Sequence, residues 1–178
     1  YDPDCNPSGY ALYSILNPNE SLADIYTTIV IHHAGNANNP TINDIQNEHM
    51  DIKGYADIGY HYVIDKAGTV YEGRNIGVRG AHVEMGNSKR IGVLVIGDFE
   101  PGDYLELPIL GEIQINDELP DVPSASQINA LRELTEYLDT RFGIDFVAGH
   151  NEFNSTRCPG DNLEPIIHEM NRLYGEGY

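Results

Sequence analysis

The hydrophobic positions of the chain predict a series of β-strands. Nearly continuous apolar runs at 27–32 and 91–97 have the length of strands and the composition of strands buried on both faces. Two shorter segments at 60–65 and 69–72 flank a turn at 66–68 and predict a β-hairpin. The run at 91–97 gives the strongest signal for a buried strand, and its glycines indicate close packing or close backbone approach. We therefore expect this run at the centre of a sheet.

Two segments have the apolar spacing of amphipathic helices. The first runs from 41 to about 53 and is expected to stop at Gly54. Its apolar face is expected to consist of Ile42, Ile45, His49 and Ile52. The second begins with a capping box, in which Ser124 precedes Gln127 by three residues, and is expected to stop at Gly143. Its apolar face is expected to consist of Ile128, Leu131, Leu134, Leu138 and Phe142.

The C-terminal part predicts one more strand and one more helix. The strand is expected at 145–149, and Asp161 is expected to begin the helix, with Glu164 at its third position. The residues expected to face inward are Leu163, Ile166, Ile167, Met170 and Leu173. Strands that alternate with helices in a chain of 178 residues favour a single α/β domain, with a mixed central β-sheet flanked by helices.

The chain is expected to consist of an irregular N-terminal arm, residues 1–24, and one domain, residues 25–178. The arm is rich in Pro, Asn and Asp and shows no sustained period. Within the domain, the stretch from about 98 to 121 contains eight acidic residues, three prolines and neither Lys nor Arg. This composition predicts an acidic surface insertion with a short hairpin around Gly111.

The charge of the chain excludes several kinds of partner. Its 28 acidic and 10 basic residues give a formal charge of −18, and such a polyanion would be repelled by nucleic acid. No apolar run approaches the roughly 20 residues of a membrane-spanning helix, so no membrane insertion is expected. Within 53–90, six basic residues against four acidic ones leave a charge of +2. This local break suits an anionic ligand, although scattered surface charge explains it equally well.

Three residues that bind metals in proteins lie at predicted strand ends or shortly after them. His32 ends the first strand, His150 follows the last strand, and Cys158 comes eight residues later in a polar loop. Strands fix the backbone while loops leave space for a substrate, so the three side chains could converge on one ion. Two imidazoles and one thiolate suit zinc and leave a fourth position for water. The spacing alone fits an ordinary hydrogen-bonded histidine and a buried cysteine as well.

Four segments carry a family resemblance. In chain order they read IVIHHAGN, DIGYHYVIDKAGTVYEGR, GAHVEMGNSKRIGVLVIGDF and AGHNEFNSTRCPGD. With these segments, and with the spacing from His150 to Cys158, the chain resembles the zinc-dependent N-acetylmuramoyl-L-alanine amidases of type 2. That superfamily includes the animal peptidoglycan recognition proteins and phage lysozymes of amidase type. The resemblance runs from about Thr27 to Tyr174 and implies the α/β fold of that superfamily.

The resemblance implies roles for individual residues. His32, His150 and Cys158 would bind one zinc ion per chain. Tyr60 occupies the position of the family's catalytic tyrosine, whose hydroxyl can hydrogen-bond the attacking water or the developing oxyanion. Thr156 matches a position that is lysine in the phage enzymes and threonine in the catalytic recognition proteins. A neutral hydroxyl therefore replaces a cation there, which leaves the strength of oxyanion stabilisation open.

The resemblance also implies a substrate. The bond cleaved would be the amide between the lactyl group of N-acetylmuramic acid and the L-alanine of the stem peptide. His49 and His82 fall where the family lines its substrate groove, and Arg74 lies near it. The pair Gly54-Tyr55 resembles the Gly-Trp pair that recognition proteins use for stem peptides with meso-diaminopimelate.

Two interpretations of the function follow from the resemblance. One is a zinc hydrolase of peptidoglycan, and the other is a recognition module of the same fold that binds muropeptides without cleaving them. Non-catalytic relatives commonly lack the cysteine or a histidine ligand, so the complete ligand set together with Tyr60 favours the enzyme. Either partner, peptidoglycan or a muropeptide, places the protein in the periplasm, at the cell surface or outside the cell, although the sequence shows no signal segment. With Cys158 on zinc, Cys5 is expected to be a free or an intermolecular thiol.

Overall fold

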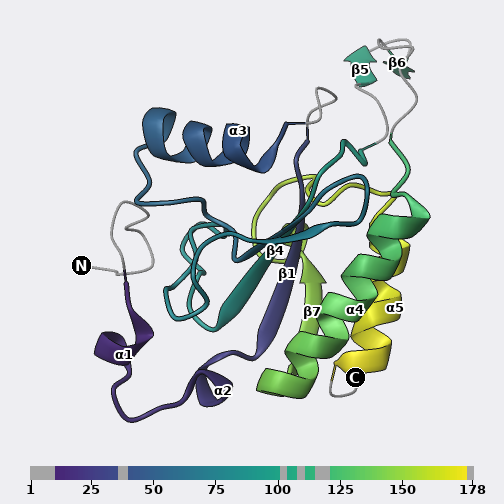
Figure 1. Ribbon diagram of the computed structural model, residues 1–178. Coiled ribbons are helices and arrows are strands. Elements are labelled where there is room, and N and C mark those ends of the chain that lie inside the picture. Colours follow the sequence, from purple (N-terminus) through teal and green to yellow (C-terminus); the bar gives the residue numbers. More distant parts are fainter. Residues whose placement is uncertain (1–10, 36–39, 101–103, 108–110, 115–120, 176–178) are drawn as a thin grey trace.

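The computed structural model describes residues 11–35, 40–100, 104–107, 111–114 and 121–175. A five-stranded mixed sheet with the order β3-β2-β4-β1-β7 forms its centre (Figure 1). The strands are β1 (Thr28–His33), β2 (Tyr62–Ile64), β3 (Val70–Glu72), β4 (Arg90–Val95) and β7 (Phe146–Gly149). β2 and β3 pair antiparallel as a hairpin, and the other neighbours are parallel. The predicted mixed sheet, its hairpin and the central position of β4 are confirmed.

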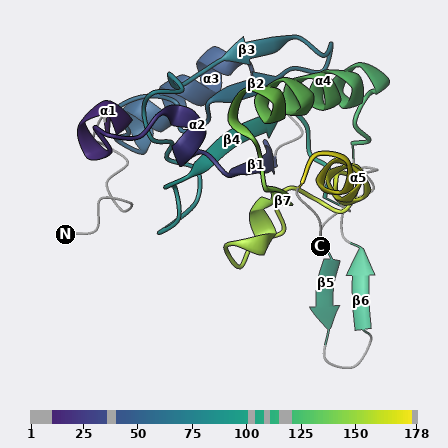
Figure 2. The same ribbon diagram turned by 90° about the horizontal axis from the view of Figure 1, so that it is seen from below.

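Helices cover both faces of this sheet (Figures 1 and 2). On one side α4 (Ala125–Phe142) packs against α5 (Glu164–Tyr174), and the larger hydrophobic cluster lies between these helices and the strands. On the other side α3 (Ile42–Asn47) continues into a π-helical turn, Glu48–Ile52. A smaller cluster lies beneath α3 and consists of Ile45, Ile58, Val63, Leu94 and Ile96. The fold therefore has three layers, with the sheet in the middle.

Alternation along β1 decides which side chains reach each face of the sheet. Ile31 belongs to the larger cluster, on the side of α4 and α5. His32 points to the opposite face, where its register partner Leu94 belongs to the smaller cluster. His33 returns to the side of Ile31 and packs against Phe99, with 6.4 Å between the ring centroids. The strand thus sends two adjacent histidines to opposite faces.

The segment predicted as a helix over 41–53 forms in two parts. Thr41 caps α3 through a capping box with Asp44, and the chain leaves the π-helical turn near Gly54, which has φ +70°. The expectation that Ile52 belongs to the apolar face is wrong, because its side chain is 80% exposed. A π-helical turn holds more residues than an α-helical turn, so a spacing of three and four residues no longer keeps one face.

The long helix α4 agrees with its prediction. The Ser124 side chain accepts a hydrogen bond from the backbone of Gln127, and the Gln127 side chain accepts one in return. Gly143 ends the helix in the left-handed conformation with φ +67°. The residues of the expected apolar face that are buried are Leu131, Leu134, Leu138 and Phe142.

The last helix begins later than the sequence predicts. The expectation that Asp161 begins it is wrong, because α5 starts at Glu164 and Leu163 is its N-cap residue. The backbone N–H of Asn162 donates to the carbonyl oxygen of Phe99 at 3.2 Å. This tertiary hydrogen bond holds the preceding residues in a turn, which a local capping rule does not foresee.

The inner face of α5 differs from its prediction at one position. Leu173 was expected to face inward, which is wrong, because it is 56% exposed. Met170 is buried in the larger cluster, and Tyr174, one helical turn further on, packs against the same cluster. The buried stripe therefore continues through Tyr174, and Leu173 falls on the outer side.

The residues before β1 pack against the sheet domain. The stretch expected to be irregular contains two single-turn helices, α1 (Tyr13–Leu16) and α2 (Leu22–Ile25). Tyr13 is buried in the larger cluster, and its backbone N–H donates to the carbonyl oxygen of Gly77 at 3.0 Å. Cys5 lies outside the described residues, so the expected state of its thiol stays a prediction.

The acidic insertion carries the predicted short hairpin. β5 (Tyr104–Leu107) and β6 (Gly111–Gln114) pair antiparallel and project from the body of the molecule (Figures 1 and 2). At the base of the insertion, the backbone N–H of Asp121 donates to the carbonyl oxygen of Asp98 at 2.8 Å. The Asp121 carboxylate accepts hydrogen bonds from the Asp98 backbone at 3.3 Å and from Lys66 Nζ at 2.7 Å. The two ends of the insertion therefore meet.

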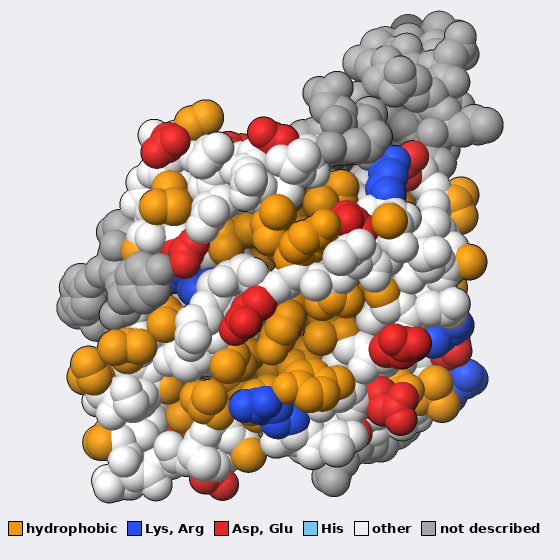
Figure 3. Space-filling model, viewed as in Figure 1, with side chains coloured by type: hydrophobic (Ala, Val, Ile, Leu, Met, Phe, Trp, Pro, Cys, Tyr) orange, Lys and Arg blue, Asp and Glu red, His pale blue; other side chains and the backbone are white. Residues whose placement is uncertain are grey.

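The face of the molecule drawn in Figure 3 is apolar over much of its centre. On the face drawn in Figure 3, hydrophobic side chains gather in a central band and no histidine is visible. His32, His49 and His82 are buried. None of the described helices is long and apolar enough to span a membrane.

Candidate metal centre

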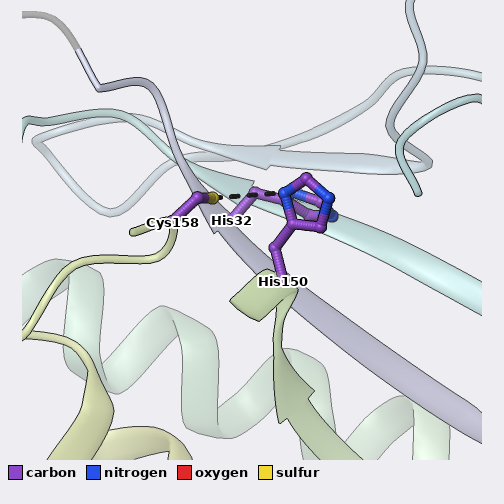
Figure 4. Close-up of side chains that lie close together, drawn as sticks. All are labelled: His32, His150 and Cys158. Carbon is purple, nitrogen blue, oxygen red and sulfur yellow. Dashed lines mark hydrogen bonds between the residues drawn. The ribbon is translucent and has the colours of Figure 1, made fainter. Parts of the chain in front are cut away.

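Three side chains from separate segments meet at the carboxyl ends of β1 and β7. His32 lies near the end of β1, His150 directly follows β7, and Cys158 lies on the loop before α5. Figure 4 shows the three side chains close together. One possible ligand atom of each lies within 4.8 Å of those of the other two, and His32 Nδ1 is 3.7 Å from Cys158 Sγ. The structure therefore brings together the three residues that the sequence singles out as metal ligands.

The spacing and the donor atoms suit a single zinc ion. Zn–N bonds of about 2.0 Å and Zn–S bonds of about 2.3 Å at tetrahedral angles put nitrogen and sulfur ligands roughly 3.6 Å apart. The 3.7 Å between His32 Nδ1 and Cys158 Sγ agrees with this value. Zinc binds imidazole nitrogens and thiolate sulfur, and in catalytic zinc sites three protein ligands leave a fourth position for water. No other three metal-binding side chains are grouped so closely among the described residues.

Burial puts the two imidazoles in the neutral form that metal binding requires. It lowers the pKa of His32 well below its usual value, and the neighbouring His82 and His150 act in the same direction. Burial also lowers the pKa of His150. The pKa of the Cys158 thiol is raised by burial to about 12, although a hydrogen bond from the His33 backbone opposes the shift. A cation bound here would displace the thiol proton, so metal binding should release it.

Each of the three side chains has a hydrogen-bonding partner outside this group of three. His32 Nε2 lies 3.0 Å from Nδ1 of His82, and His150 Nε2 lies 2.9 Å from Oδ1 of Asn154. The His33 backbone N–H donates to Cys158 Sγ at 3.4 Å. Such outer hydrogen bonds fix the orientation and the tautomer of metal-binding rings. They leave Nδ1 of both histidines for a metal ion.

A cavity of about 550 Å³ lies beside these residues. Its lining includes His150, together with Tyr60, Thr156, His49 and His82. The volume is within the range of pockets that hold small ligands. Five of the eight residues that the sequence proposes for the site therefore surround one open space.

Tyr60 and Thr156 are placed to act as hydrogen-bond donors. The Tyr60 ring lies 5.0 Å from the His32 ring, and burial, followed by the proximity of Cys158, raises the pKa of the Tyr60 hydroxyl. Tyr60 therefore keeps its proton at neutral pH. The Thr156 hydroxyl oxygen accepts a hydrogen bond from the Cys158 backbone N–H at 3.2 Å. This contact positions the Thr156 hydroxyl and leaves its proton for another partner.

His49 and His82 form the inner wall of the cavity. His49 Nδ1 accepts a hydrogen bond from the Gly59 backbone at 2.9 Å, and burial lowers the pKa of His49 to about 4. His82 packs tightly over β4, because a Cβ atom on Gly92 would lie only 2.5 Å from its ring. The close approach that the glycines of this strand predict is therefore confirmed at Gly92.

Arg74 is not brought into the cavity. Its side chain is 1% exposed, and its guanidinium donates to the carbonyl oxygens of Ile58 at 2.8 Å, Asp57 at 3.0 Å and Arg79 at 3.1 Å. Arg79 is buried as well. These two arginines contribute to the positive charge of the stretch 53–90, yet their burial keeps them from the surface. Arg74 therefore organises the backbone behind the site.

Two asparagines take part in the site although the sequence patterns do not indicate them. Asn87 Oδ1 accepts hydrogen bonds from the backbone N–H groups of His82 at 2.7 Å and Val83 at 2.9 Å. Asn154 contacts His150 and the backbone of Glu84. An asparagine in a polar loop is common, so nothing in the sequence distinguishes these two from solvent-exposed residues.

The fold and the site define a class of protein, namely a three-layer α/β domain with a candidate His-His-Cys metal centre at the ends of parallel strands. The chain belongs to the N-acetylmuramoyl-L-alanine amidase family, whose family model matches residues 23–161. The predicted family and fold class are thus confirmed.

Individual relatives include recognition proteins and amidases. Peptidoglycan-recognition protein SC2 of Drosophila melanogaster is 36% identical over 150 residues, which cover 80% of this chain and 73% of that protein. An N-acetylmuramoyl-L-alanine amidase of Sus scrofa is 31% identical over 133 residues, which cover 72% of this chain and 19% of that protein. Among solved structures, the N-acetylmuramoyl-L-alanine amidase LysC from Clostridium intestinale URNW superposes with a TM-score of 0.66 at 29% identity. That match covers 85% of this chain and 89% of LysC.

Proposed function

We propose that the protein is a zinc-dependent amidase that hydrolyses the amide bond between N-acetylmuramic acid and L-alanine in peptidoglycan. The observation that carries the proposal is the convergence of His32, His150 and Cys158. It lies beside a cavity that His150, Tyr60 and Thr156 line. Membership of a family that is typically zinc-dependent supports it, as do relatives that are named as amidases.

Amide hydrolysis requires an activated water molecule and stabilisation of the oxyanion that forms when the carbonyl is attacked. Held by His32, His150 and Cys158, one zinc ion per chain would supply the Lewis acidity that activates the water and polarises the carbonyl. The three ligands leave the fourth side open, so the scissile bond can approach from the cavity.

Tyr60 and Thr156 donate hydrogen bonds to the oxyanion in this proposal. The raised pKa of Tyr60 keeps its hydroxyl protonated, and the Thr156 hydroxyl is oriented by its contact with the Cys158 backbone. Both donors are neutral, so each contributes less electrostatic stabilisation than a cation would at the same place. Single substitutions of Tyr60 and Thr156 therefore test how much each hydroxyl contributes to oxyanion stabilisation.

His49 and His82 are proposed to bind the sugar and peptide parts of the substrate from the cavity wall, where Tyr55 also lies. Arg74 would act on the substrate only through the backbone that it holds. The resemblance of Gly54-Tyr55 to the Gly-Trp pair of recognition proteins favours stem peptides with meso-diaminopimelate. A peptidoglycan or muropeptide substrate places the working protein in the periplasm, at the cell surface or outside the cell.

The test combines zinc analysis with peptidoglycan digestion. Purified wild type and Cys158→Ala are analysed for bound zinc, and mass spectrometry then identifies the fragments that each releases from peptidoglycan. We expect about one zinc per wild-type chain and free stem peptides that begin with L-alanine. The other cysteine of the chain provides the matched control, since Cys5→Ala should retain both zinc and activity.

A different outcome would favour the second interpretation. If wild type binds intact muropeptides and releases no stem peptide even when it is loaded with zinc, the protein is a recognition module. The roles given to Tyr60 and Thr156 would then be withdrawn.

A further inference from the structure

Asn154 contacts both a candidate metal ligand and the backbone of another residue that lines the cavity. It follows His150 by four residues and contacts Glu84, which is 70 residues away in the chain. Glu84 and Asn154 both line the cavity. The interactions of this one side chain therefore join two parts of the site.

The backbone of Glu84 determines which way the Asn154 amide group points. The Glu84 N–H donates to Oδ1 of Asn154 at 3.2 Å, and Nδ2 of Asn154 donates to the Glu84 carbonyl oxygen at 3.3 Å. A backbone N–H can only donate and a carbonyl oxygen can only accept. The reversed amide would therefore place donor against donor and acceptor against acceptor.

This orientation determines the tautomer of His150. Oδ1 of Asn154 lies 2.9 Å from Nε2 of His150, and an amide oxygen has no proton to donate. Nε2 must therefore carry the proton in the neutral ring, which leaves the lone pair on Nδ1. A metal ion binds the ring nitrogen that bears the lone pair. In metal-binding histidines, a hydrogen bond from the other nitrogen usually determines which nitrogen that is.

The loop that contains Glu84 also contacts His32, the other candidate histidine ligand. His82 lies two residues before Glu84, and its Nδ1 is 3.0 Å from Nε2 of His32. Asn87 holds this loop by accepting hydrogen bonds from the backbone N–H groups of His82 and Val83. The segment 82–84 therefore contacts both candidate histidine ligands. The His82 side chain contacts His32, and the Glu84 backbone is connected to His150 through Asn154.

We propose that Asn154 is a positioning residue that selects the Nε2-protonated tautomer of His150 and ties this ligand to the cavity wall at Glu84. The part that concerns zinc rests on the proposed function, because it takes His150 as a zinc ligand. The part that concerns the tautomer does not depend on a bound metal.

Two substitutions separate the positioning role from a merely structural one. Asn154→Ala removes both the acceptor for His150 and the contacts with Glu84. Asn154→Asp keeps an acceptor for His150 Nε2–H and loses the donor to the Glu84 carbonyl oxygen. Glu152→Gln changes an exposed residue of the same segment and is the matched control.

Zinc affinity is measured by competition with a chelator on metal-free protein reloaded with zinc. Asn154→Ala should weaken zinc binding by about 10- to 100-fold, which is the usual effect of removing an outer hydrogen bond. Asn154→Asp and Glu152→Gln should stay within about threefold of wild type. The zinc inference is overturned if Asn154→Ala binds as wild type does, or if Asn154→Asp loses as much affinity as Asn154→Ala.

A second readout uses the metal-free protein. Nitrogen-15 NMR of the histidine rings should show His150 protonated at Nε2 in wild type and a mixture of tautomers in Asn154→Ala. A wild-type ring protonated at Nδ1 would overturn the proposal. If wild type has the expected tautomer but binds no zinc, the proposed function fails and the link between Asn154 and His150 stands.

Discussion

The candidate metal centre and the acidic insertion both lie at the carboxyl ends of the parallel strands, but different contacts hold them in place. His32, His150 and Cys158 come from three segments, and each has a further hydrogen-bonding partner within the fold. The hairpin formed by β5 and β6 pairs with itself and projects from the body (Figure 1). The ends of the insertion are joined by a backbone hydrogen bond between Asp98 and Asp121.

This difference indicates how substitutions should act in the two regions. At the metal centre several segments fix one geometry, so removing a single group should cost much activity while the fold persists. Among the described residues of the insertion, the hydrogen bonds to the body lie at its base, so we expect large changes in the hairpin to cost little. Both statements lead to measurable expectations.

The largest effect is expected from the two adjacent histidines of β1. His32→Ala should remove zinc binding and lower the rate of stem-peptide release by roughly 10³-fold or more, because the ion proposed to activate the water would be lost. His33→Ala should keep the zinc, since its ring points to the other face of the sheet and contacts Phe99. Zinc analysis and a peptidoglycan digest measure both quantities. Equal loss of zinc in the two variants would contradict the assignment of opposite faces.

A smaller effect is expected from the hydroxyl of Tyr60. Tyr60→Phe removes one proposed oxyanion donor and keeps the ring that packs against His32, so kcat should fall by about 10²- to 10³-fold. KM and zinc content should stay near those of wild type. Tyr71→Phe is the matched control, since the Tyr71 hydroxyl bonds to Asp65 on the hairpin β2–β3. A rise in KM without a fall in kcat would assign Tyr60 to substrate binding instead.

The regular elements around the site could be predicted from the sequence because their signals are local. The apolar run of β4 and the capping box at Ser124 depend on neighbouring residues only. The candidate ligands His32, His150 and Cys158 were proposed because the segments around them resemble those of a known family, since their spacing alone also fits ordinary residues. These signals require no knowledge of the tertiary structure.

The contacts that were not predicted depend on residues far apart in the chain. The amide group of Asn154 is oriented by the backbone of Glu84, which is 70 residues away in the chain. Arg74 has the charge expected of an anion-binding residue, but its guanidinium donates hydrogen bonds to the carbonyl oxygens of Ile58 and Asp57. The start of α5 is set by a hydrogen bond from Asn162 to Phe99. No periodicity or capping rule contains such information.

A pH effect is expected from His61, which is buried behind the cavity. Its Nδ1 accepts from the Gly92 backbone at 3.0 Å, and burial lowers its pKa to about 4. In the unfolded chain the pKa of histidine is about 6.5, so between these values the unfolded state binds more protons and stability falls as the pH falls. Because of His61, the free energy of unfolding should fall by about 2 kcal/mol when the pH is lowered from 6.5 to 4.5.

Urea unfolding of the metal-free protein at several pH values measures the effect of His61. The difference in unfolding free energy between wild type and His61→Gln should shrink by that amount as the pH is lowered, because the variant lacks the titrating ring. His168→Gln is the control, since the His168 side chain is 72% exposed. Parallel pH profiles for wild type and His61→Gln would contradict the expectation.

The smallest effect is expected from removing the hairpin of the insertion. Replacing residues 101–120 by a short glycine-rich linker keeps Asp98 and Asp121, whose hydrogen bond already brings the two ends together. A shorter connection between ends that already meet changes the closure entropy only slightly, so the free energy of unfolding should change by less than about 1 kcal/mol. Zinc content and KM should also be retained. A marked rise in KM would show instead that the hairpin shapes the substrate groove.

The base of the insertion provides the contrasting variant, because it belongs to the region of the metal centre. Phe99 is fully buried, its backbone N–H donates to His33 Nδ1 at 3.2 Å, and a Cβ atom on Gly160 would lie 2.5 Å from its carbonyl carbon. Phe99→Ala should therefore cost about 3 to 5 kcal/mol of unfolding free energy through the cavity it leaves. If Phe99→Ala and the hairpin deletion had equally small effects, the boundary between the two regions would not lie at the base of the insertion.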